Sequence, residues 1–106
     1  MQMIVYLYRW KIKAGKELQF EENWSIVTEA ILDQCGSYGS RLHRSAQGEY
    51  LGYAQWPDQL TREKCELDAS VQDARVLMRD AIEFSYEDDL LEIRSDYLVH
   101  QLHVSP

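Results

Sequence analysis

The chain has 106 residues and a formal net charge of −7 at pH 7, with 45% hydrophobic and 27% charged residues. This length supports one domain spanning residues 1–106, and the balance of residue types is that of a globular protein rather than a disordered one. The acidic excess argues against a nucleic acid or an anionic membrane surface as partner, and no apolar run approaches the ~18 residues of a transmembrane helix.

A first strand is predicted for residues 3–12. In residues 3–12 the even positions, from Ile4 to Ile12, are all apolar or aromatic, whereas the odd positions begin apolar and end charged. This pattern predicts a strand that is buried on both faces along its first half. The N-terminus has neither a basic region nor a small-residue cleavage site, so we expect no signal peptide.

A long helix is predicted for residues 16–35. Phe20, Trp24, Val27 and Ile31 recur at helical spacing, and Gly36 stands where a left-handed residue commonly ends a helix. Residues 38–45 and 50–56 then predict two strands of a hairpin, joined by a loop that contains glycine.

The C-terminal half predicts two helices and a last strand. Pro57-Asp58 begins a short helix over residues 58–66, and Ser70 with Asp73 resembles a capping box ahead of a helix over residues 71–84. Apolar residues alternate with polar ones between Leu90 and Leu102, which predicts the last strand.

The two cysteines, Cys35 and Cys65, form no CxxC pair and have no histidine at metal-ligand spacing. We therefore expect a reduced protein in the cytoplasm, with no metal site at these residues. Because Cys35 directly precedes the expected helix end, we interpret it as a small buried hydrophobic side chain.

The predicted order β-α-β-β-α-β is that of the ferredoxin-like α+β fold, an antiparallel four-stranded sheet with two main helices on one face. The helices can cover only that face, and the strands also carry apolar residues on the other. Monomers avoid large exposed apolar patches. We therefore expect a homodimer whose sheets pack face to face as a dimeric α/β barrel, with the C-terminal strand helping to hold the partner.

Three segments carry a family resemblance: residues 10–17 (WKIKAGKE), residues 39–44 (GSRLHR) and residues 53–58 (YAQWPD). With the predicted order of elements, they make the chain resemble the antibiotic biosynthesis monooxygenase family of the dimeric α/β-barrel superfamily. The resemblance implies a pocket between sheet and helices. It also implies oxidation of a phenol or quinone-like molecule without flavin, haem or metal, since the anion of such a substrate can itself give an electron to dioxygen.

The resemblance assigns candidate roles to residues of the predicted strands and the first helix. On this basis His43 is the proton acceptor and Tyr8 its hydrogen-bond partner. The walls of the pocket are Tyr6, Trp24, Tyr53 and Trp56. A structural interpretation competes with each assignment: the aromatic residues also suit a core or an interface, and His43 also suits a solvated strand surface.

The haem-degrading branch of the family fits less well. Counting back from Gly15, its strand asparagine is replaced by Tyr8, and residues 58–84 contain neither tryptophan nor histidine. The haem iron would then lack its axial ligand. Two functions stay open: an oxygenase that needs no cofactor, acting on a small aromatic molecule, and a dimeric module of the same fold that only binds a ligand or a protein.

Overall fold

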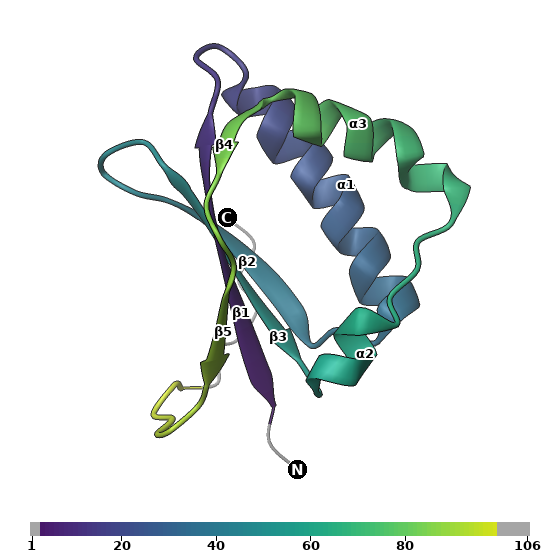
Figure 1. Ribbon diagram of the computed structural model, residues 1–106, viewed down its shortest axis with the longest axis vertical. Helices are drawn as coiled ribbons and strands as arrows, with labels where there is room; N and C mark the ends of the chain where they lie inside the picture. Colours follow the sequence, from purple (N-terminus) through teal and green to yellow (C-terminus); the bar gives the residue numbers. More distant parts are fainter. Residues whose placement is uncertain (1–2, 100–106) are drawn as a thin grey trace.

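The computed structural model describes residues 3–99 and contains one antiparallel sheet. Its central strand β1 (Ile4–Ile12) pairs on one side with β3 (Tyr50–Trp56), which pairs in turn with β2 (Gly39–Arg44). The other side of β1 holds both β4 (Ile82–Ser85) and β5 (Asp89–Glu92). The sheet of one chain is open rather than a closed barrel (Figure 1).

The helices lie together on one face of this sheet (Figure 1). These are α1 (Glu17–Cys35), the short α2 (Gln59–Glu63) and α3 (Gln72–Asp80), which follows the 3₁₀ turn η1 (Ala69–Val71). None of the helices within residues 3–99 is long and apolar enough to cross a membrane. The ferredoxin-like α+β prediction is confirmed, whereas the face-to-face barrel concerns two chains and stays a prediction.

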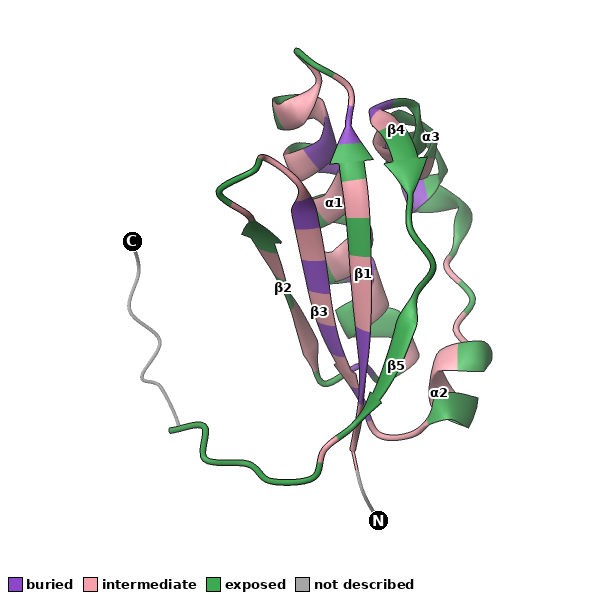
Figure 2. Ribbon diagram, turned by 60° about the vertical axis from the view of Figure 1, so that its left-hand side comes forward, coloured by how far each residue is buried: buried purple, intermediate pink, exposed green. Residues whose placement is uncertain are grey.

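Strand alternation decides which side chains form the core (Figure 2). Along β3, Tyr50, Gly52, Ala54 and Trp56 are buried, while the residues between them are only partly covered. The paired register places these residues on the same face as the even positions of β1. The helices supply the other half of the core, and Phe20 of α1 is completely buried. We call the other face of the sheet the open face.

The end of α1 is set by Gly36, which adopts the left-handed conformation (φ 73°). A side chain at this φ would be strained, so glycine lets the chain leave the helix and turn into β2. Near the start of α1, Lys16 and Gln19 both hydrogen-bond the Asp80 carboxylate at the end of α3. The two helices are therefore joined at this end as well as through their apolar sides.

The predicted last helix and last strand need correction. The helix α3 ends at Asp80 rather than residue 84, because Ile82 pairs with Ile12 in the sheet. The strand that we expected over residues 90–102 lies earlier, as β4 and β5, which pair with opposite halves of β1. Between them, the Tyr86 amide still donates to the Arg9 carbonyl at 3.0 Å. Residues 93–99 are in no strand, and residues 100–102 lie outside the described part.

The expectation of two reduced cysteines is also wrong. Cys35, the last residue of α1, and Cys65, just after α2, form a disulfide. Cys35 is only half-buried, so it is not the small buried hydrophobic residue that we expected. Because disulfides are rare in a reducing cytoplasm, this pairing removes the ground on which we expected a cytoplasmic protein.

Candidate functional site

A cavity of about 180 Å³ lies between the helix-covered face of the sheet and α1 and α3. We call it the inner cavity. Its walls include all three tryptophans of the chain, together with Tyr8, Gly52 and Met78. Aromatic and apolar walls with one or two hydroxyl groups are typical of a site for a small planar molecule.

The aromatic wall is built by the even positions of β1. The rings of Tyr6, Tyr8 and Trp10 stack along the strand, with centroids 6.3 Å and 5.7 Å apart. Gly52 of β3 lies opposite Tyr8 of β1 in the sheet. A Cβ atom at Gly52 would lie 2.9 Å from the Trp10 ring, closer than real Cβ contacts. This glycine is therefore what lets Trp10 lie flat across β3.

The Tyr8 hydroxyl is held by a guanidinium group from another element. Arg62 of α2 donates from Nε to Tyr8 Oη at 3.0 Å. The Cζ atom of its guanidinium group lies 3.8 Å from the centre of the Tyr6 ring. Arg62 Nη2 also forms an ion pair with Asp88 Oδ2 at 3.4 Å. Arg62 thus combines a hydrogen bond, a cation–π contact and an ion pair, which together fix its orientation.

Burial raises the pKa of Tyr8, and the neighbouring Arg62 only partly opposes this effect. Tyr8 therefore keeps its proton at neutral pH. Because its oxygen already accepts from Arg62, its own O–H remains able to donate to another acceptor. The pair can offer a charge-assisted donor to a bound molecule that carries an anionic oxygen.

A second, wider space of about 720 Å³ adjoins the inner cavity. We call it the outer cavity. The two share the lining residues Tyr8, Val27, Ile31, Trp56 and Met78, and the outer cavity extends past α2, the segment after it and α3. Its wall also contains Cys65, so the disulfide lies at the edge of the site.

Trp56 lies on the wall shared by both cavities. Its indole Nε1 is buried and has no hydrogen-bond partner among residues 3–99. An unpaired buried donor costs about 1–3 kcal/mol. A small rotation of the ring toward an acceptor on a bound molecule would recover part of this energy.

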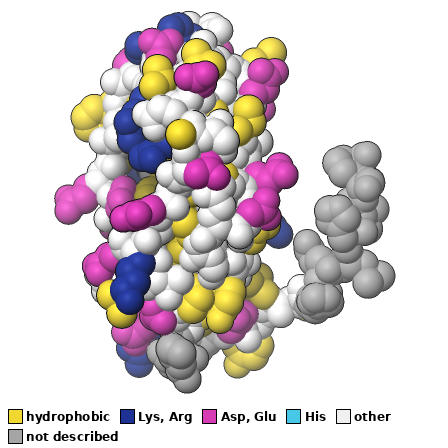
Figure 3. Space-filling model, turned by 90° about the vertical axis from the view of Figure 1, so that its right-hand side faces the viewer, with side chains coloured by type: hydrophobic (Ala, Val, Ile, Leu, Met, Phe, Trp, Pro, Cys, Tyr) yellow, Lys and Arg dark blue, Asp and Glu magenta, His cyan; other side chains and the backbone are white. Residues whose placement is uncertain are grey.

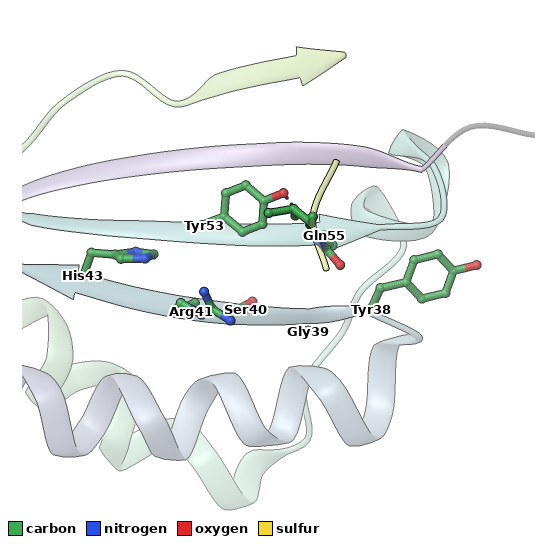
Figure 4. A pocket seen from close by; sticks show the side chains of 8 residues that line it. Tyr38, Gly39, Ser40, Arg41, His43, Tyr53 and Gln55 are labelled. Carbon is green, nitrogen blue, oxygen red and sulfur yellow. Dashed lines mark hydrogen bonds between the residues drawn. The ribbon is translucent and has the colours of Figure 1, made fainter. Parts of the chain in front are cut away.

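The structure separates the predicted site residues into two groups. Tyr8, Trp24 and Trp56 line the inner cavity, and Tyr6 packs beside them under Arg62. His43 and Tyr53 instead line a hollow of about 530 Å³ on the open face, with Tyr38, Arg41 and Gln55 (Figure 4).

His43 is exposed and pairs with Leu51 in the sheet, which places both on the open face. Within one chain, His43 and Tyr8 therefore lie on opposite faces of the sheet and do not meet.

Sequence reasoning missed Arg62, Trp10 and Gly52 as members of the site. Arg62 lies 54 residues from Tyr8 along the chain, and nothing in the local sequence indicates this contact. Gly52 did carry a signal, because a glycine inside a strand often marks a close approach of another group.

A ferredoxin-like α+β fold with an aromatic cavity under its helices is the class that this geometry defines. Among solved structures, the chain is similar to SnoaB, a cofactor-independent oxygenase from Streptomyces nogalater. The TM-score is 0.75 at 17% identity, and the match covers 92% of this chain and 98% of that one.

Two other solved structures have the same fold. Rv0793 from Mycobacterium tuberculosis matches with a TM-score of 0.73 at 9% identity, over 92% of this chain and 100% of that one. A Caulobacter crescentus protein, named provisionally as an antibiotic biosynthesis monooxygenase, matches with a TM-score of 0.73 at 16% identity, over 88% and 91%.

Neither a protein-family model nor a curated protein matches the sequence. The resemblance to antibiotic biosynthesis monooxygenases is confirmed at the level of the fold, by the solved structures alone.

Proposed function

We propose that this protein is a cofactor-independent monooxygenase that oxidises a small phenolic molecule, such as an anthrone or a hydroquinone, in the inner cavity. The observation that carries the proposal is the Tyr8 hydroxyl, which Arg62 holds at 3.0 Å beside a cavity walled by three tryptophans. The fold shared with a cofactor-independent oxygenase supports it further.

The reaction needs no reductant besides the substrate. A substrate anion gives one electron to dioxygen, and the resulting radical combines with superoxide to form a peroxide. The peroxide then loses water and leaves a carbonyl. For a reacting CH₂ group the balance is R₂CH₂ + O₂ → R₂C=O + H₂O, in which the substrate supplies both electrons and both hydrogens. The protein must bind the ring, stabilise the anion and exclude water.

Each requirement has a candidate residue. The tryptophan walls stack on a flat ring and keep the cavity apolar. Tyr8 donates to the phenolate oxygen, and the adjacent Arg62 charge strengthens this hydrogen bond. The substrate proton passes to water in the outer cavity, which Glu63 and Glu66 also line. His43 lies on the other face and takes no part in this scheme.

The test combines oxygen uptake with ligand binding on a panel of anthrones, hydroquinones and phenols. Because all three tryptophans line the inner cavity, quenching of intrinsic fluorescence reports binding there. We expect saturable uptake, and a fall in kcat of about 10²-fold in Tyr8→Phe, the size that loss of a donor to a developing anion typically causes. Tyr86→Phe, which loses a hydroxyl outside both cavities, is the matched control.

Two results would argue against the proposal. Binding with fluorescence quenching but no oxygen uptake across the panel would identify a module that only binds its ligand. Full turnover in Tyr8→Phe with loss in His43→Ala would move the reaction to the hollow on the open face.

We also propose that the protein is a homodimer that packs through its open face. This face carries the half-buried Leu7, Leu51 and Tyr53 and the exposed Phe84 and Leu91. Large apolar side chains that gather on one uncovered face of a sheet are typical of an interface between subunits.

A further inference from the structure

The lining of the outer cavity has more basic than acidic side chains, although the chain as a whole is strongly acidic. Three arginines line it, Arg62, Arg75 and Arg79, although the whole chain has only eleven basic residues and a net charge of −7. The carboxylates on its lining are Glu63 and Glu66. On the helix side of the molecule, a few basic side chains lie beside apolar and acidic ones (Figure 3).

The three arginines are not equivalent. Arg62 is already engaged by Tyr8, Tyr6 and Asp88. Arg75 and Arg79 form no ion pair with any carboxylate of residues 3–99, including Glu63 and Glu66. Their guanidinium groups therefore keep their donors available on the cavity wall.

The position of this pair is set by α3. Arg75 and Arg79 are four residues apart, so they lie one turn apart on the same side of the helix. Met78, between them in sequence, lines both the inner and the outer cavity. A ring bound in the inner cavity against Met78 would thus have its outer end next to the two guanidinium groups.

Glu63 and Glu66 constrain where an anion can lie. Glu63 ends α2 and Glu66 follows it, whereas both free arginines are on α3. An anionic group is repelled by the glutamates on the α2 side of the cavity and attracted by the arginines on the α3 side. A carboxylate suits the α3 side, because its two oxygens match the planar fork of a guanidinium group.

We propose that the substrate is an aromatic acid, whose ring occupies the inner cavity and whose carboxylate binds Arg75 and Arg79. The proposal rests on the function proposed above, since it names the substrate class of the same site. It assigns these two arginines as specificity residues, distinct from Tyr8 and Arg62, which stabilise the phenolate oxygen.

The experiment compares two probes with the same ring system, 1,4-dihydroxy-2-naphthoate and its methyl ester, which removes the negative charge and adds one methyl group. Binding to the full chain is measured anaerobically by titration calorimetry, so that neither probe is oxidised. We expect the acid to bind about tenfold more tightly than the ester, the size expected for charge-assisted hydrogen bonds discounted for solvent. This preference should shrink at high ionic strength.

The Arg75→Gln/Arg79→Gln variant should bind the acid and the ester within about twofold of each other, with ester affinity unchanged. Glutamine is also a good helix former, so α3 should be preserved. Arg41→Gln is the matched control, because Arg41 is exposed on the open face and forms no ion pair with any carboxylate of residues 3–99; it should keep the full preference.

Equal binding of the two probes by the wild type would overturn the proposal while leaving the oxygenase proposal in place. A preference that survives in the double variant would overturn it as well, since the anion would then be held elsewhere. If neither probe binds, both this proposal and an aromatic ligand of this class in the inner cavity are refuted.

Discussion

Removing the disulfide should be one of the most damaging small changes to this protein. The bond closes a loop with a sequence separation of 30 residues, which contains both strands of the hairpin and α2. The loop-entropy relation gives about 3.6 kcal/mol of stabilisation at 25 °C for a loop of this size. That is a large share of the 5–15 kcal/mol typical of a whole domain.

The structure shows why α2 in particular depends on this bond. The helix has five residues and none of them is buried, so it gains little from packing. A helix this short is also unstable alone. Besides the disulfide, it is held by the Asp58 side chain, which accepts from the Thr61 amide at 2.7 Å, and by the contacts of Arg62. Loss of the disulfide should therefore loosen Arg62 and the Tyr8 hydrogen bond with it.

The assay is urea unfolding at pH 7 of the wild type and of Cys35→Ala/Cys65→Ala. We expect the free energy of unfolding to fall by about 3–4 kcal/mol in the variant. The wild type in reductant should fall by a similar amount, whereas the variant should not respond to reductant. A fall of less than about 1 kcal/mol in both arms would refute the reasoning, because it would mean that the two segments are held together equally well without the bond.

Three further predictions concern the sheet. Gly52→Ala should cost about 1–3 kcal/mol and weaken aromatic ligand binding, because the added Cβ would lie 2.9 Å from the Trp10 ring; melting and fluorescence titration measure the two effects. Burial and the hydrogen bond to Glu21 raise the pKa of Tyr50 to about 12. The contribution of Tyr50 to the free energy of unfolding should thus be fully present below pH 10 and fall by about 1–2 kcal/mol between pH 10 and 12. The Tyr50→Phe variant should lack this pH dependence. Sedimentation equilibrium should give twice 12.5 kDa for the wild type and a monomer for Leu51→Lys; a monomeric wild type at micromolar concentration contradicts the dimer.

The sequence predicted those parts of the fold that have a clear period. The even positions of β1 and the apolar stripe of α1 both face the core as expected, and Gly36 ends the helix. The region after residue 80 was mispredicted because its apolar residues fit both the period of a helix and that of a strand. Ala81 and Ile82 continue the apolar stripe of α3, yet Ile82 is also the first residue of β4. Only pairing with Ile12 decides between the two, and that contact is not local.

The position of His43 could have been predicted from β2 itself. In this strand Leu42 is the one large apolar residue, between Arg41 and His43. Alternation then places Leu42 toward the core and its two neighbours toward the open face. The disulfide had no comparable signal, because the spacing of two cysteines along a chain does not tell how far apart they lie in the fold.

The two faces of the sheet suit different tasks for a physical reason. The face under α1 and α3 is closed by helices of the same chain, so a cavity there stays apolar whether or not a second chain binds. On the open face, a hollow between exposed strands becomes dry only when something covers it. Chemistry that needs a water-poor site is therefore better placed beside Tyr8 than beside His43. The association that we propose through Leu51 and Tyr53 would stabilise the sheet from its other face, away from the proposed reaction.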